Sequence, residues 1–128
     1  GMMDMQEDPL YREIIIENWR NPANLGVVES PDFDVERDNS FCGDRIRMTG
    51  KIKDGRLTDI AFSGQGCAVS TAAASLLTEE IKGREIKDIQ NLTEQDALSL
   101  LGVQLTPNRT KCALLAYRTL KDALKQID

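Results

Sequence analysis

The most regular pattern in the chain is an alternation of apolar and polar side chains between Arg45 and Lys53. An extended strand would separate three apolar from four polar residues, namely Ile46, Met48 and Ile52 from Arg45, Arg47, Thr49 and Lys51. Asp54-Gly55 predicts a hairpin turn, and residues 57–62 return as a second strand. Residues 33–37 have the character of an edge strand. The alternation therefore predicts a small antiparallel sheet.

Helical patterns occupy most of the rest of the chain. Five segments are expected to be helices, namely residues 10–19, 67–82, 85–89, 93–101 and 107–126. Asp8 and Pro9 suit an N-cap and a first helical position, and Gly83 and Gly102 end two of the helices. Residues 63–66 predict a turn. Because the strands precede most of the helices, we expect an α+β domain with helices covering one face of the sheet.

Size and charge narrow the class of the protein. The 128 residues match one domain, expected to span residues 1–128. There are 16 Lys and Arg against 21 Asp and Glu, and the net charge of −5 argues against a nucleic-acid binder, which needs clustered cations. No apolar run approaches the roughly 18 residues of a membrane span, and the acidic N-terminus is unlike a secretory signal. A cytoplasmic protein without membrane partners is therefore expected.

The chain contains three cysteines and no histidine. An odd number of cysteines fits poorly with a closed set of disulfides, and thiols in a reducing compartment pack as small apolar groups, bind metals or react. Without imidazole, Ser-His-Asp and Cys-His catalytic groups and histidine-containing metal sites are excluded. A metal ion would have to be held by thiolates, carboxylates or backbone groups.

Four side chains are the candidate site residues. Cys42 and Asp44 flank Gly43 in the turn before the alternating strand, so both can bend towards one point. Cys67 lies at the start of a predicted helix and Cys112 in the first turn of the last one, where amide groups and the helix dipole favour anions. If these segments converge, three thiolates and one carboxylate form a tetrahedral site suited to Zn²⁺. The same ligands suit an iron–sulfur cluster.

Each of these residues also has an interpretation without a metal. Cys112 lies on the apolar stripe of the last helix and Cys67 precedes an Ala-rich helix, so both can be packing residues. Asp44 can be a turn or capping residue, and Gly64 and Gly66 can serve only to permit a turn. The sequence has no Cys-x-x-Cys pair. From the residues alone, the chain is a small acidic α+β domain with a candidate thiolate metal site.

Five short stretches follow one another in an order that is typical of a known family. They are residues 21–26 (NPANLG), 42–46 (CGDRI), 64–70 (GQGCAVS), 72–79 (with AAAS and TE) and 107–113 (PNRTKCA). Together they extend over nearly the whole chain, and they are specific as a set although no single stretch is. On these residues the chain resembles the iron–sulfur scaffold family that comprises IscU, the N-terminal part of NifU, and SufU.

The resemblance implies a three-stranded antiparallel sheet with helices on one face, and a metal site at one exposed tip. By position, Cys42, Asp44, Cys67 and Cys112 match the ligands of the family, with Cys42 as the expected persulfide acceptor and Cys112 as its rival. Family members take sulfur from a cysteine desulfurase. IscU-type members assemble a [2Fe–2S] cluster and pass it to carriers or apo-proteins, whereas SufU-type members bind Zn²⁺ and transfer sulfur.

Two features bear on whether the chain is of the IscU type or the SufU type, and they point in opposite directions. Lys111 stands where IscU-type proteins have a histidine, as in SufU, but residues 83–107 are too short for the insertion typical of SufU. The chain is therefore identified as a SufU-like or intermediate member. Two alternatives stay open, a metal or cluster carrier without sulfur transfer and a thiol-redox domain with a transient disulfide. A hydrolytic enzyme is the weakest alternative, since the sequence offers no histidine base.

Overall fold

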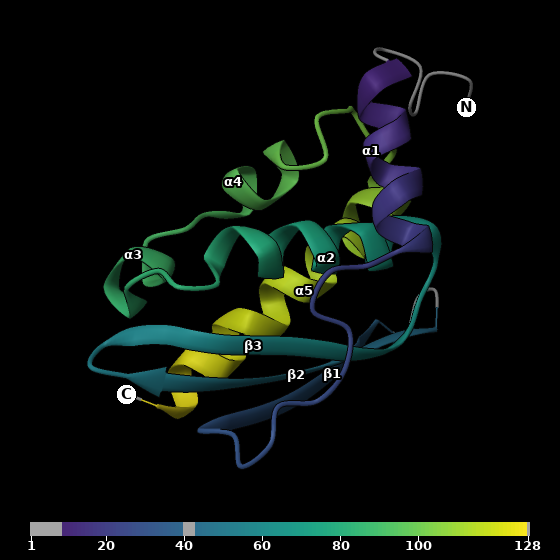
Figure 1. The fold of residues 1–128 in the computed structure, drawn as a ribbon. Helices are drawn as coiled ribbons and strands as arrows, with labels where there is room; N and C mark the ends of the chain where they lie inside the picture. Colours follow the sequence, from purple (N-terminus) through teal and green to yellow (C-terminus); the bar gives the residue numbers. More distant parts are fainter. Residues whose placement is uncertain (1–8, 40–42, 128) are drawn as a thin grey trace.

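The protein has a sheet of three antiparallel strands in the order β1-β2-β3, with helices on one of its faces (Figure 1). The computed structural model describes residues 9–39 and 43–127. Its elements are α1 (Pro9–Arg20), β1 (Phe33–Asn39), β2 (Asp44–Lys53), β3 (Arg56–Gln65), α2 (Ala68–Ile81), α3 (Ile86–Gln90), α4 (Glu94–Ser99) and α5 (Pro107–Gln126). The α+β class is confirmed, and each predicted helix and strand is present with bounds that differ by a few residues.

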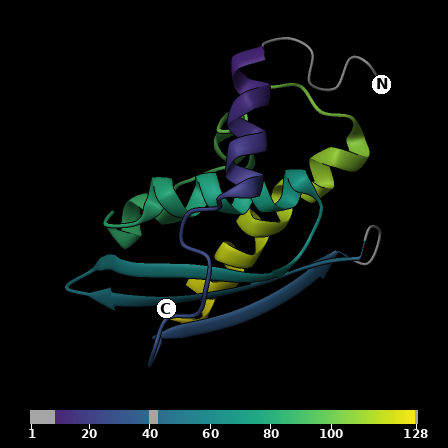
Figure 2. The ribbon, with the colours of Figure 1, turned by 45° about the vertical axis from the view of Figure 1, so that its right-hand side comes forward.

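The helices form layers above the sheet (Figures 1 and 2). α5 packs across β1 and β2, α2 packs on β3 and on α5, and α1 packs on α2. Apolar side chains fill the space between sheet and helices, with Met48, Phe62 and Leu120 among the buried residues of the main core. In the described part of the chain, no helix is both long and apolar enough to cross a membrane.

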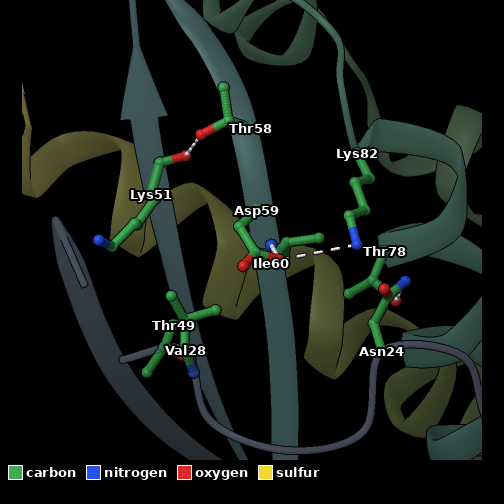
Figure 3. A network of polar contacts seen from close by, with 9 residues as sticks. All are labelled: Asn24, Val28, Thr49, Lys51, Thr58, Asp59, Ile60, Thr78 and Lys82. Carbon is green, nitrogen blue, oxygen red and sulfur yellow. Dashed lines mark hydrogen bonds and ion pairs between the residues drawn. The ribbon is translucent and has the colours of Figure 1, made fainter. Parts of the chain in front are cut away.

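The connection between α1 and β1 covers part of the other face of β2. The alternation predicts that Thr49 lies on a polar face, but this side chain is only 1% exposed. The backbone amide of Val28 donates a hydrogen bond to Thr49 Oγ1 at 2.9 Å (Figure 3). The prediction for Thr49 is therefore wrong, because a contact between residues 21 positions apart leaves no trace in the local pattern.

The same connection fastens β3 to α2. Asn24 Nδ2 donates to Thr78 Oγ1 on α2 at 3.2 Å (Figure 3). On the other side, the amide of Phe62 in β3 donates to the carbonyl of Asn24 at 2.9 Å, and the amide of Gly26 donates to the carbonyl of Phe62 at 2.8 Å. These bonds hold the strand and the helix in a fixed relation, and so they also frame the short link between them.

The hairpin turn is present as predicted, but the end of β3 differs from the prediction. Asp54 and Gly55 both have positive φ, 54° and 76°, as a two-residue turn between twisted strands requires. Ser63, Gly64 and Gln65 were expected in a turn, whereas they continue β3 and pair with β2. The turn is therefore shorter than predicted. The last residues of β3 pair with the first residues of β2.

Tyr117 on α5 supplies a test of the packing between α5 and the α3–α4 connection. Its side chain is buried, and its hydroxyl donates to the carbonyl of Leu92 at 2.9 Å. Burial raises the pKa of Tyr117, and the negative charges of Glu94 and Asp96 raise it further. The neutral phenol is thus favoured in the folded state, and this stabilisation is present below the ordinary tyrosine pKa and is lost as pH rises through the raised value.

We expect Tyr117→Phe to lower the free energy of unfolding by about 1 kcal/mol at neutral pH, because one buried hydrogen bond is lost. Urea denaturation at pH 7 and at a pH above about 10 measures both effects. Wild type should lose more stability than the variant over this interval, because only wild type carries the phenol. An equal loss in both proteins would show that Tyr117 does not contribute to alkaline destabilisation.

Candidate metal centre

Asp44 is a buried carboxylate at the start of β2. It is 3% exposed, and a buried carboxylate needs hydrogen-bond partners to offset its lost hydration. Its Oδ1 accepts the backbone amide of Cys67 at 3.1 Å, and its Oδ2 accepts the hydroxyl of Ser70 at 2.5 Å. Both partners belong to the start of α2. Asp44 is therefore more than a turn residue, because its carboxylate joins the sheet to the first turn of a helix.

Cys67 is the N-cap of α2. Its sulfur accepts the backbone amide of Ser70 at 3.5 Å, a bond that Ser, Thr, Asp or Asn more commonly makes at a helix start. The residue is exposed, and its Sγ lies 3.9 Å from Asp44 Oδ2. A Cβ added at Gly66 would lie 3.0 Å from the Cβ of Ser70 and 3.5 Å from the carboxylate of Asp44. The lack of a side chain at Gly66 therefore lets the link pass close to Asp44.

Cys112 lies deeper in the helix than expected. α5 begins at Pro107, so Cys112 is its sixth residue and belongs to the second turn. The predicted benefit from the helix dipole is therefore wrong, because that effect falls off within the first turn. The side chain is 7% exposed and packs in a cluster with Ile15, Val69 and Leu101. The expectation of an apolar packing role for Cys112 is confirmed, and this packing fixes where its sulfur lies.

Three of the four candidate side chains converge. One ligand atom each from Asp44, Cys67 and Cys112 lies within 4.8 Å of the other two. In a tetrahedral zinc site with Zn–S near 2.3 Å and Zn–O near 2.0 Å, ligand atoms are about 3.5–3.8 Å apart. The separations of the three ligand atoms therefore exceed those of such a site by at most about 1.3 Å. They come from β2, the start of α2 and α5, which meet towards one end of the sheet (Figures 1 and 2).

Cys42 lies outside the described residues. In the sequence it precedes Asp44 by two positions, and Asp44 is a member of the cluster. Its assignment as a fourth ligand and as a sulfur acceptor stays a prediction. The three described donors, two thiols and one carboxylate, are of the types that zinc and iron–sulfur clusters take. The residues present therefore fit either metal centre.

Ser70 is a polar residue of this cluster to which the sequence pattern gives no separate role. Its hydroxyl bonds to Asp44 and lies 3.6 Å from the sulfur of Cys67. The only local signal is its spacing, three residues after the N-cap Cys67 in the first turn of α2. That spacing predicts a capping amide, but it says nothing of the side chain, because Asp44 is 26 residues away.

Comparison with known proteins agrees with this geometry. The chain is 34% identical over 131 aligned positions to the zinc-dependent sulfurtransferase SufU of Bacillus subtilis, covering 89% of this chain and 88% of the relative. It is also 34% identical over 134 positions to the iron–sulfur cluster assembly scaffold protein IscU of Thermotoga maritima, covering 92% and 94%. A solved structure of a putative SUF-system scaffold protein from Fervidobacterium islandicum superposes with a TM-score of 0.74 at 26% identity, covering 88% and 94%.

The match to a family extends over nearly the whole chain. Residues 10–128 match the profile of the NifU-like N terminal domain, a range that contains Cys42, Asp44, Cys67 and Cys112. The predicted resemblance to SufU, IscU and the N-terminal part of NifU is therefore confirmed. The chain belongs to the family of NifU-like N-terminal domains, whose members include proteins named as iron–sulfur cluster assembly scaffolds and as a zinc-dependent sulfurtransferase.

Proposed function

We propose that the protein takes persulfide sulfur from a cysteine desulfurase at a metal centre formed by Cys42, Asp44, Cys67 and Cys112, and passes it on during iron–sulfur cluster assembly. The observation that carries this proposal is the convergence of Asp44, Cys67 and Cys112, whose ligand atoms lie within 4.8 Å of one another. Zinc-dependent sulfur transfer is the first candidate, because the chain has no histidine and is 34% identical to a zinc-dependent sulfurtransferase.

The transfer itself is an exchange between thiols. A thiolate of the protein attacks the terminal sulfur of the persulfide on the desulfurase, a new S–S bond forms, the old one breaks, and the donor cysteine leaves as a thiolate. The sulfur atom changes carrier without a net oxidant or reductant. A bound zinc ion would keep the thiols of the site deprotonated, a task for which this sequence has no histidine.

The two described thiols differ in solvent exposure, and this difference bears on which of them can accept persulfide sulfur. Cys67 is exposed, whereas Cys112 is 7% exposed within an apolar cluster. Attack requires an accessible sulfur, so Cys112 would have to come to the surface before it could accept. The family resemblance favours Cys42 as the acceptor and retains Cys112 as its rival. Since reactive thiols persist in a reducing compartment, we place this activity in the cytoplasm.

Cluster assembly is the second candidate function. A relative that covers 92% of this chain is named as a cluster assembly scaffold protein, and the same thiol and carboxylate donors suit iron. In this case the protein would hold a [2Fe–2S] cluster as cargo and deliver it to carriers or apo-proteins. A carrier that binds metal without sulfur transfer is the remaining alternative.

The metal and sulfide content of the protein distinguishes these functions. We expect about one zinc per chain and no acid-labile sulfide after anaerobic purification without an affinity tag or chelator, since a closed four-ligand site holds one ion. The zinc-loaded protein should also stimulate sulfur release by a cysteine desulfurase. Iron and sulfide in equal amounts would instead support the scaffold, and metal binding without stimulation the carrier. Neither zinc nor iron after reconstitution would contradict the proposed centre.

A further inference from the structure

The hydroxyl of Ser70 lies beside the candidate metal centre. It donates to Asp44 Oδ2 at 2.5 Å, lies 3.2 Å from the carbonyl oxygen of Cys112, and lies 3.6 Å from Cys67 Sγ. Ser70 is 1% exposed, so water does not compete for these contacts. One buried hydroxyl therefore touches all three residues that converge, and these residues come from three different elements.

This arrangement is not explained by helix capping. The capping bond at the start of α2 runs from the backbone amide of Ser70 to the sulfur of Cys67, and any residue except proline at position 70 would supply that amide. A serine inside a helix usually turns its hydroxyl to a carbonyl of its own helix. The Ser70 hydroxyl instead reaches residues 26 and 42 positions away in the sequence.

Two hydrogen bonds from the start of α2 hold the carboxylate of Asp44. Each carboxylate oxygen has two lone pairs. The amide of Cys67 uses one on Oδ1 and the hydroxyl of Ser70 uses one on Oδ2. Each of these two bonds takes one lone pair of its oxygen, so neither bond by itself prevents Asp44 from acting as a ligand. They hold the carboxylate in one orientation, with Oδ2 3.9 Å from the sulfur of Cys67.

We propose that Ser70 is a positioning residue of the metal centre, whose hydroxyl donates to Asp44 and so orients this carboxylate towards the metal. This inference rests on the proposed function, because it presupposes that Asp44 is a ligand. Hydrogen-bond partners of ligating groups set the orientation of those groups, and their loss typically weakens metal binding by about 10–100-fold.

The test is a zinc titration of Ser70→Ala against a chromophoric chelator. We expect its Kd for zinc to rise by about 10–100-fold over that of wild type. The matched control is Ser75→Ala, the same substitution at another buried position of α2. Ser75 Oγ donates to Asn18 and accepts the amide of Ala23, so it joins α1 to α2 and does not contact the centre. Ser75→Ala should therefore change the Kd by less than about threefold, although it also removes two hydrogen bonds.

A spectroscopic readout separates positioning from stability. Cobalt bound in place of zinc has absorption bands that report the number and geometry of its thiolate and carboxylate ligands. These bands should shift in Ser70→Ala and stay unchanged in Ser75→Ala. If Ser70→Ala does not fold, the isosteric pair Ser70→Thr and Ser70→Val makes the same comparison, since the two differ only in the hydroxyl. Only Ser70→Thr should then approach the affinity of wild type.

Three results would overturn parts of this account, and they differ from one another. Equal zinc affinity in Ser70→Ala and Ser75→Ala, with unchanged cobalt spectra, would remove the role of Ser70 and leave the proposed function in place. Tighter zinc binding in Ser70→Ala would also overturn it, because Ser70 would then compete with the metal for Asp44. No zinc binding by wild type would refute zinc-dependent sulfur transfer, the first candidate function, and with it the inference that depends on Asp44 as a zinc ligand.

Discussion

Replacing Cys112 by alanine is expected to remove both the zinc-dependent stabilisation of the fold and the stimulation of a cysteine desulfurase. Cys112 is one of the three described donors, and its thiol is fixed by the apolar cluster around it. A ligand that binds only the folded state at about a thousand times its Kd stabilises that state by about 4 kcal/mol. For a chain of this size, that gain raises the Tm by roughly 10–20 °C.

The measurement compares the Tm of zinc-loaded and chelated protein for each variant. Because both forms carry the same substitution, the packing lost with the sulfur cancels from the difference. Wild type and Ser75→Ala should keep the shift, whereas Cys112→Ala should lose it. A full shift in Cys112→Ala would show that Cys112 is not a ligand.

The second measurement is the stimulation of a cysteine desulfurase, which is compared for wild type, Cys42→Ala and Cys112→Ala. If either residue accepts the persulfide or shapes the centre that does, its loss should abolish stimulation. Ser75→Ala again serves as the control, since Ser75 lies on the side of α2 that faces α1. If both cysteine variants stimulate the desulfurase as well as wild type does, the hypothesis that Cys42 or Cys112 accepts the persulfide is wrong.

Local sequence patterns were enough for most elements of this fold. The alternation in β2, the Asp54-Gly55 turn and the apolar stripe of α5 each act over a few residues, so each can be read without knowing the rest of the chain. The capping box of α4 is similarly local, with Thr93 and Asp96 exchanging side-chain and backbone bonds. The bounds of these elements were accurate to a few residues for the same reason.

The errors at Thr49 and at the end of β3 arose where distant segments meet, whereas the turn predicted for Cys112 was wrong within its own helix. Thr49 is buried by the amide of Val28, and the end of β3 stays in the sheet because Gly64 lies opposite Ile46. Similarly, the role of Ser70 depends on Asp44 and on a carbonyl of α5. Residue type was enough to identify Asp44, Cys67 and Cys112 as candidates. That their side chains converge could be assumed from the sequence but is seen only in the structure. The position of Cys42 stays a prediction.

Gly64 provides a test of whether the pairing of β3 with β2 positions the candidate metal centre. Its φ is +132°, which side-chain-bearing residues rarely adopt, and a Cβ there would lie 2.1 Å from the carbonyl oxygen of Arg45 and 3.2 Å from the Cα of Ile46. Both atoms belong to the backbone of β2, so no side-chain movement relieves the clash. Gly64→Ala should therefore push β3 away from the start of β2, where Asp44 lies.

We expect Gly64→Ala to lower the free energy of unfolding by about 3 kcal/mol or more, and to weaken zinc binding as well. The matched control is Gly55→Ala, because Gly55 also has a positive φ, 76°, but an added Cβ would meet nothing within 4 Å. It lies in the turn at the other end of β2, so it should cost only about 1 kcal/mol and leave zinc affinity unchanged. Urea denaturation and the zinc titration measure the two effects.

Equal destabilisation by both alanines would show that conformation alone, and not the contact with Arg45, requires a glycine at position 64. A Gly64→Ala protein that is destabilised but binds zinc as wild type does would show that Asp44 keeps its place without this strand pairing.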